Sequence, residues 1–136
     1  MGFALEIVTP DRLVISDEVE KVVCPGAEGE FGVLPNHVPL ITKMKIGEVR
    51  YIDSTVKKEH ILVVTGGYVE VTDQKVIVLA DQCIRARDID KVQEELNLQK
   101  SEEILKVAEK NTDEYRNAKR TNDLAKAQLK VLEKTG

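Results

Sequence analysis

The sequence has no tryptophan, only 4% aromatic residues and no long apolar run. A hydrophobic core must therefore be built mainly from valine, isoleucine and leucine. No window approaches the ~20 apolar residues that are needed to cross a bilayer. Residues 1–12 also lack the basic region and the apolar run of a signal peptide. From these features we expect the chain to stay in the cytoplasm.

Neither sign of charge dominates, since 20 Lys and Arg are interspersed with 24 Asp and Glu for a formal net charge of −4. This balance argues against a nucleic-acid partner. The cysteines, Cys24 and Cys83, lie far apart, and His37 and His60 are not at metal-ligand spacing, so no metal site is predicted. We expect buried, reduced thiols, and the sequence alone leaves a disulfide open.

The first part of the chain has the pattern of strands. With 136 residues, 42% of them hydrophobic, the chain is long enough for one domain, or for a small domain with an appendage. Up to about Ala86, apolar and polar residues alternate or form short Val and Ile runs, as in 3–8, 19–23, 59–64 and 75–79. Many short strands with no intervening helix predict an antiparallel β-sandwich over residues 1–86.

Near Asp88 the period becomes helical. Apolar residues at helical spacing are Ile89, Val92, Leu96, Ile104, Leu105 and Ala108. Asp88 is the predicted N-cap, with Asp90 in the first turn. Asn111 and Glu114 resemble the capping box of a second helix. The apolar residues of that helix are Tyr115, Ala118, Ala125, Leu129 and Leu132. Residues 88–136 are therefore predicted to form a two-helix antiparallel hairpin.

An isolated pair of such helices is marginally stable, because the apolar stripes are short relative to the backbone entropy of ordering them. We therefore expect the hairpin to need a docking surface, either the sandwich or another protein, which is the bistability that a conformational switch requires. A local basic cluster in the second helix could meet an acidic surface or a phosphate, or it could be a solvated face. It comprises Arg116, Lys119, Arg120 and Lys126.

Residues 26–40, GAEGEFGVLPNHVPL, form the most informative segment. Three glycines and two prolines in fifteen positions indicate a shaped surface loop. Its apolar residues either cover one end of the sandwich or form a rigid patch that recognises a partner. They are Phe31, Val33, Leu34 and Leu40. Glu30 could simply be solvated, and His37 could simply hydrogen-bond its own turn.

Residues 29–40 resemble the signature G-E-x-G-x-x-P-x-H-x-P-L of the epsilon subunit of bacterial and chloroplast F-type ATP synthases. The opening Val8-Thr9-Pro10-Asp11 and the segment GGYVEV at 66–71 resemble two further parts of that family's pattern. The order of these parts fits the whole chain. The resemblance implies a central-stalk subunit that couples rotation of the gamma subunit to the c-ring during ATP synthesis by ion transport. It also implies a peripheral location at the cytoplasmic face of the cell membrane.

The resemblance further implies what the two parts do. Residues 1–86 are expected to bind the gamma subunit and the polar loops of the c-ring, with Glu30 facing the c-ring and His37 facing gamma. Residues 88–136 are expected to be regulatory, extending along gamma into the catalytic alpha/beta hexamer to inhibit ATP hydrolysis. In that state the basic cluster of the second helix would face acidic surface.

The sequence departs from the family at its ATP-binding pattern, I/L-D-x-x-R-A. Ile89 and Asp90 match, but Gln93 replaces the arginine and Glu94 replaces the alanine. Loss of one charge-assisted contact typically lowers affinity by roughly ten- to a hundredfold. We therefore expect no cofactor, and weak or absent ATP binding at this remnant. A role for Asp90 at a helix N-terminus is sufficient to explain it.

No catalytic constellation is visible, since the sequence has neither a phosphate-binding GxxxxGK[ST] nor a GxSxG elbow. We therefore expect a non-catalytic subunit. Two other classes stay open from the residues alone: a freestanding β-sandwich binding module whose helices mediate oligomerisation, and a small nucleotide sensor. Co-purification with gamma, alpha and beta subunits would separate the first class from a stalk subunit, and ATP affinity would identify the second.

Overall fold

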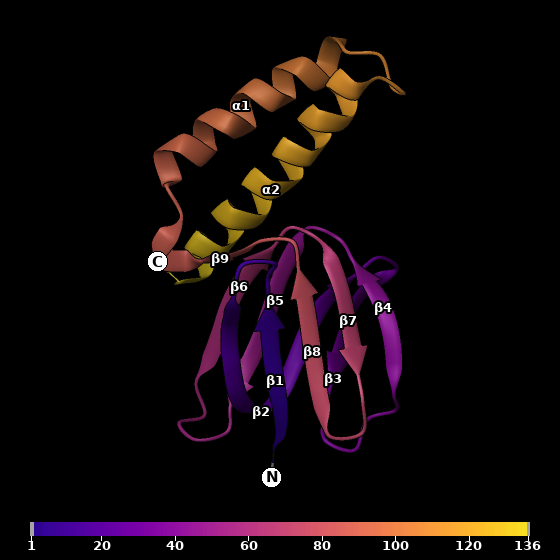
Figure 1. Ribbon diagram of the computed structural model, residues 1–136. Helices are drawn as coiled ribbons and strands as arrows, with labels where there is room; N and C mark the ends of the chain where they lie inside the picture. The colour runs from indigo at the N-terminus through magenta and orange to yellow at the C-terminus, as the bar shows by residue number, and fades with distance from the viewer. Residues whose placement is uncertain (1, 136) are drawn as a thin grey trace. The chain divides into compact units, whose positions relative to one another are not determined.

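The computed structural model describes residues 2–135, which divide into two units, one up to Ile84 and one from Arg85 onward. Figure 1 shows strands in the first unit and helices in the second. The strands are β1 (Phe3–Val8), β2 (Leu13–Gly26), β3 (Gly29–Val33), β4 (Leu40–Met44), β5 (Gly47–Asp53), β6 (Glu59–Val64), β7 (Gly67–Val71), β8 (Lys75–Ala80) and β9 (Cys83–Arg85). The helices are a short 3₁₀ turn η1 (Ala86–Asp88), α1 (Lys91–Val107) and α2 (Asp113–Thr135). The predicted β-sandwich followed by a helical hairpin is confirmed.

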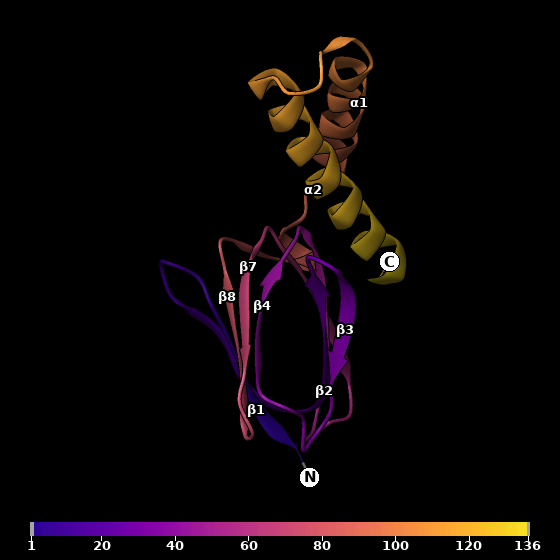
Figure 2. The ribbon, with the colours of Figure 1, turned by 90° about the vertical axis from the view of Figure 1, so that its right-hand side faces the viewer.

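The strands form one sheet that folds back on itself. Its order is β1-β8-β7-β4-β2-β5-β6-β9, with β3 added to β2 and a further pairing of β1 with β2. Figure 2 shows β4, β7 and β8 in one layer and β2 and β3 in the other. β1 pairs antiparallel with β2 but parallel with β8. The parallel pairing with β8 is an exception to the predicted antiparallel sheet, whereas the short connection from β1 into β2 gives the antiparallel pairing on the other side of β1.

The core of the sandwich is built mainly from aliphatic residues, as the composition predicts. In β1, Leu5 and Ile7 are fully buried, and they pair in register with the buried Val76 and Val78 of β8. The thiol of Cys24 lies in this core, and burial raises its pKa to about 12. Cys24 and Cys83 do not form the disulfide that the sequence left open, and Cys83 is half-buried where a buried thiol was expected.

Both helices begin later than predicted, α1 by two residues and α2 by one. Asp90, not Asp88, caps α1, because its Oδ1 accepts a hydrogen bond of 3.1 Å from the backbone N–H of Gln93. Asp88 instead ends η1. For α2, the hydroxyl of Thr112 accepts a hydrogen bond of 3.2 Å from the backbone N–H of Tyr115. Asn111, the predicted cap, has a φ of 71° and ends the interhelical turn in the left-handed conformation that asparagine tolerates.

The predicted apolar stripe of α1 is only partly covered, because Ile89, Leu105 and Ala108 are half-buried whereas the other three residues are exposed. Val92 is 76% exposed, and Leu96 and Ile104 are also exposed. Within the described chain, the buried residue of α1 is Ser101. In α2, Ala118 and Ala125 are buried as expected, together with the polar Asn122 and Gln128 and with Val131. The two helices pack side by side (Figure 1), and their buried residues are small or polar apart from Val131, while the predicted Leu105, Leu129 and Leu132 are half-buried.

Within residues 2–135, neither helix combines the length and the apolar character needed to cross a membrane.

Candidate functional site

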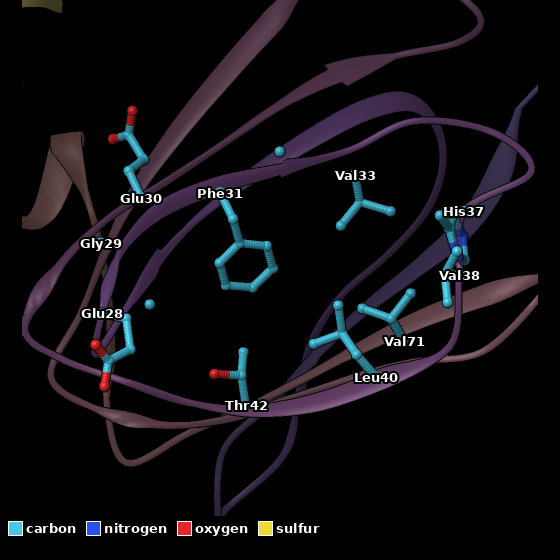
Figure 3. A pocket seen from close by; sticks show the side chains of 12 residues that line it. Glu28, Gly29, Glu30, Phe31, Val33, His37, Val38, Leu40, Thr42 and Val71 are labelled. Atoms are coloured by element: carbon cyan, nitrogen blue, oxygen red, sulfur yellow. The ribbon is translucent and has the colours of Figure 1, made fainter.

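The segment that the sequence singled out lines an open apolar groove in the sandwich. The groove has a cavity volume of about 440 Å³ and lies between β3 and β4 and the connection that joins them. Figure 3 shows Phe31 and Val33 on the β3 side, with Leu40 and Thr42 on the β4 side. Of the predicted interface residues, the structure therefore brings Glu30, Phe31, Val33, His37 and Leu40 to one cavity.

The groove walls are mostly apolar. Val33 and Val71 are buried at its floor, and the ring of Phe31 points into the cavity (Figure 3). Leu40 is exposed, and Val38 is 77% exposed at the mouth. Because water contacts these apolar surfaces, covering them with a partner would stabilise the complex.

The β3–β4 connection is shaped by its turn residues. Asn36, between Pro35 and His37, has a φ of 66°, a left-handed conformation that asparagine adopts more readily than most residues. The two prolines fix φ near −65° on either side of this turn. Leu34 is exposed on this connection but does not line the groove. The connection thus presents apolar side chains on a restrained backbone, which lowers the entropy lost on binding.

His37 lies at one end of the groove. Its ring packs edge-on against Phe3, with ring centroids 5.2 Å apart and an interplanar angle of 78°. Both ring nitrogens are enclosed and have no hydrogen-bond partner among the described residues. The simple reading that His37 bonds its own turn is therefore wrong. A buried polar atom without a partner is unfavourable.

Glu30 points away from the groove (Figure 3) and is not merely solvated. Its two carboxylate oxygens accept hydrogen bonds of 2.9 Å each from Nη1 and Nη2 of Arg50. Nη1 of Arg50 also donates to Oε1 of the buried Glu48 at 2.8 Å. The hydrogen bond with Glu30 is the main reason that the pKa of Arg50 is raised. The side chain of Glu30 remains 53% exposed, so it can still contact a partner.

Two of the four basic residues predicted to face acidic surface already have acidic partners. In α2, Arg116 is paired with Asp113, and Nζ of Lys119 lies 2.9 Å from Oδ1 of Asp123. The hydrogen bond to Asp123 raises the pKa of Lys119. Arg120 and Lys126 are exposed on the same helix. Fewer unpaired basic side chains are therefore available to an acidic partner than the four that the sequence predicts.

The remnant of the ATP pattern has a structural role. Asp90 caps α1, as described above, and the backbone N–H of Ile89 donates to the carbonyl of Ala86 at 3.2 Å. At the position of the family's arginine, the amide of Gln93 donates to Oδ1 of Asn97 at 2.9 Å. These side chains satisfy one another within the helix. Across residues 2–135, no group of three or more His, Cys, Asp or Glu side chains is placed to hold a metal ion.

Sequence reasoning missed several residues of these sites. Glu28, Val38, Thr42 and Val71 also line the groove. Val38 stands inside the signature, and its position between two prolines is the sequence feature that could have identified it. The contacts of Arg50 with Glu30 and of Asn122 with Ser101 carry no signal in the sequence, because each partner comes from a segment twenty or more residues away.

Comparisons with known proteins agree with the features described. Residues 2–86 match the family model described as ATP synthase, Delta/Epsilon chain, beta-sandwich domain. The chain is 42% identical over 132 residues to the ATP synthase epsilon chain of Syntrophobacter fumaroxidans, covering 96% of each protein. It is 54% identical over 86 residues to that of Nitratidesulfovibrio vulgaris (strain DSM 19637 / Miyazaki F). This match covers 63% of each protein, so it spans less than two thirds of that relative's length.

Solved structures share the fold. A chain in the mitochondrial ATP synthase of Euglena gracilis, in a structure of OSCP, F1 and the c-ring, matches with a TM-score of 0.83 and 17% identity, covering 96% of this chain and 80% of that chain. A chain from the central stalk and c-ring of the Tetrahymena thermophila mitochondrial enzyme matches with a TM-score of 0.62 and 11% identity, covering 97% of each. At these identities the similarity concerns the fold alone.

Proposed function

This chain belongs to the ATP synthase delta/epsilon chain family, and we propose that it is the epsilon subunit of an F-type ATP synthase, acting in the central stalk without a catalytic site of its own. The observation that carries this proposal is the 42% identity to an epsilon chain over 96% of both proteins. That match includes the helical unit as well as the sandwich. The subunit would be held peripherally at the cytoplasmic face of the membrane through the assembled enzyme.

In this proposal the sandwich couples the gamma subunit to the c-ring during ATP synthesis by ion transport. The apolar groove beside β3 and β4 supports a protein contact, because Val38 and Leu40 are exposed at its mouth and the connection between the strands is restrained. Leu34 extends this patch beyond the groove. His37, whose ring nitrogens lack partners, would face gamma. Glu30 would face the polar loops of the c-ring, and its ion pair with Arg50 fixes the direction of its carboxylate.

The hairpin would regulate ATP hydrolysis. An extended state is populated only if its contacts with gamma and the alpha/beta subunits exceed those lost on leaving the compact state. The buried polar pair of Ser101 and Asn122 between α1 and α2 favours such a change, because polar groups lose less on exposure to water than apolar groups do. Arg120 and Lys126 are exposed and ready to meet acidic surface, whereas Arg116 and Lys119 would have to exchange partners.

We also propose that no nucleotide is needed. Glu94 would place a negative charge near a polyphosphate, and the amide of Gln93 is already bonded to Asn97. A calorimetric titration of the purified chain with ATP is expected to show weak or no binding. Low-micromolar affinity would contradict this part of the proposal and favour a nucleotide-sensing role.

The proposal is tested by reconstituting an alpha, beta and gamma head with the full chain or with a variant lacking residues 88–136. The full chain is expected to bind gamma and to lower ATP hydrolysis, and the shortened chain to bind gamma without lowering hydrolysis. Unchanged hydrolysis with either form would remove the inhibitory role. Failure of the full chain to bind gamma, together with a stable homo-oligomer, would support a freestanding binding module instead.

A further inference from the structure

The side of α1 that faces away from α2 carries exposed apolar residues. α2 packs along α1 (Figure 1) on the side where Ser101 is buried and Leu98 and Leu105 are half-buried. Because an α-helix turns by about 100° per residue, Leu96 and Val107 lie on the far side of α1. They are 41% and 83% exposed. Apolar residues that share one exposed helix face are typical of an interaction surface.

Two charged residues lie between them in a symmetric pattern. The outer row of α1 consists of Leu96, Lys100, Glu103 and Val107, at spacings of four, three and four residues. These spacings are those of successive core positions in a coiled coil, so the four side chains follow one line along the helix. From either end of the row, the order is apolar, charged, charged, apolar. Reversing the direction exchanges lysine for glutamate.

The two charges of the outer row are available to a partner. Lys100 and Glu103 are both exposed, and within residues 2–135 neither forms an ion pair. They are three residues apart in the helix, the spacing at which Asp113 and Arg116 do pair in α2. A partner surface that places a carboxylate at Lys100 and an ammonium group at Glu103 would therefore complement both.

We propose that the outer row binds the outer row of a second copy of this chain, with the two α1 helices antiparallel. In this arrangement Leu96 meets Val107 of the second copy, and Lys100 meets Glu103 of the second copy. A two-fold axis makes each contact occur twice. A parallel pair would instead place Lys100 against Lys100 and Glu103 against Glu103, and like charges facing each other are unfavourable. The row thus selects the antiparallel orientation.

The dimer is expected to be weak. A single pair of helices in contact over four residues each buries less than the roughly 1,200 Å² of a stable complex. Charged pairs at core positions fix the register of two helices at a cost in stability. We therefore expect a dissociation constant of roughly 10 μM to 1 mM. This association is a property of the free chain and goes beyond the proposed function.

Sedimentation velocity of the full chain, from about 10 μM to about 1 mM, tests the proposal. The chain is expected to shift from monomer to dimer. Lys100→Glu places two carboxylates opposite each other, and Glu103→Lys places two ammonium groups opposite each other, so either variant should weaken the dimer at least tenfold. The double variant restores opposite charges at both contacts and should regain the dimer. An equimolar mixture of the two single variants should regain it for the same reason.

The matched controls are Lys91→Glu and Glu102→Lys, which make the same charge changes at exposed positions of α1 outside the outer row. Both should dimerise like the original chain. A chain that stays monomeric at about 1 mM, or single variants that dimerise as well as their controls, would contradict the proposal. A double variant that stays monomeric would also contradict it. Gamma binding is measured separately, so failure of the dimer leaves the proposed function intact, and failure to bind gamma leaves the dimer intact.

Discussion

The side-chain amide of Asn122 in α2 donates a hydrogen bond of 3.2 Å to the hydroxyl of Ser101 in α1, and both residues are 2% exposed. The same hydroxyl donates to the carbonyl of Leu98 at 2.9 Å. A hydrogen bond contributes about 1 kcal/mol net, whereas a buried leucine contributes about 1.5–3 kcal/mol. A polar pair flanked by alanines therefore holds these helices together less tightly than a leucine seam would.

Replacing one member of this pair should destabilise the hairpin. In Ser101→Ala the buried amide of Asn122 loses its acceptor, and we expect the hairpin to lose about 1–3 kcal/mol. Ser101→Ala combined with Asn122→Leu removes both polar groups and should be as stable as the original chain or more so. The measurement is hydrogen exchange of the α2 amides, because a chain with two units does not unfold as a single two-state system.

Equal protection of α2 in Ser101→Ala and in the original chain would show that the pair carries no stability. A control is Gln99→Ala with Asn117→Leu, which makes the same kinds of change at exposed positions of the two helices. That double variant should change protection by less than ~0.5 kcal/mol.

Arg50 lies between the carboxylates of Glu30 and Glu48, and replacing it should lower the stability of the sandwich more than replacing the half-exposed Glu30. Arg50→Met leaves Glu48, whose side chain is 8% exposed, without its ion-pair partner, and we expect the sandwich to lose about 3 kcal/mol. Glu30→Gln removes a half-exposed partner and should cost less than ~1 kcal/mol. Urea unfolding of both variants measures the difference. Equal losses would mean that Glu48 gains nothing from Arg50.

This ordering also separates folding from binding. Because Glu30→Gln is expected to leave the sandwich folded, any loss of affinity for the c-ring or for gamma in that variant reflects the contact itself. Arg50→Met offers no such separation.

The sequence predicted the sandwich well because strand formation follows a local pattern. Buried residues alternate in β1 and β8, and this period of two is visible in the chain without any knowledge of the partners. The groove was partly predictable, because glycines and prolines mark the turns around Phe31 and His37. The segment therefore identified where the site lies, but not that Val71 closes its floor from β7.

The hairpin was predicted less well because several of its fully buried positions are polar. Val92 and Leu96 lie at helical spacing but are exposed, whereas Ser101 and Asn122 are buried. A hydrophobic pattern cannot identify an interface in which two polar side chains satisfy each other across helices. The same limit hid the pairing of Glu30 with Arg50, since the register of β2 between β3 and β5 brings them together.

Two glycines with similar backbone conformations provide a test of close strand packing. Gly67 and Gly29 have φ values of 122° and 136°, so a side chain is strained at both. A Cβ at Gly67 would lie 1.9 Å from the carbonyl oxygen of Leu79, whereas a Cβ at Gly29 would meet nothing within 4 Å. Gly29→Ala should cost about 1–3 kcal/mol from strain alone, and Gly67→Ala substantially more.

Thermal unfolding of the isolated variants, followed by circular dichroism, distinguishes these cases. Gly67→Ala is expected to melt well below Gly29→Ala or to remain unfolded. Similar melting of the two variants would show that the contact of Gly67 with β8 relaxes without loss.

The buried thiol of Cys24 should make the sandwich less stable at high pH. Its folded pKa is about 12, above the ordinary value of about 8.5, so between these values the folded state binds more protons than the unfolded state. Stability therefore falls as pH rises through that window, by at most about 1.4 kcal/mol per pH unit. Urea unfolding at pH 8, 9, 10 and 11 should show a steeper decline in the original chain than in Cys24→Ala. Parallel declines would contradict the assignment.

A hairpin that is harder to open should inhibit less, if inhibition requires α1 and α2 to separate. The double variant Ser101→Ala with Asn122→Leu is expected to favour the closed hairpin, and each 1.4 kcal/mol of added stability lowers the open population about tenfold. An alpha, beta and gamma head carrying this variant should then hydrolyse ATP faster than one carrying the original chain, with gamma binding unchanged. If exchange shows a more stable hairpin but hydrolysis stays equally inhibited, the helices inhibit without separating, and the polar pair serves packing alone.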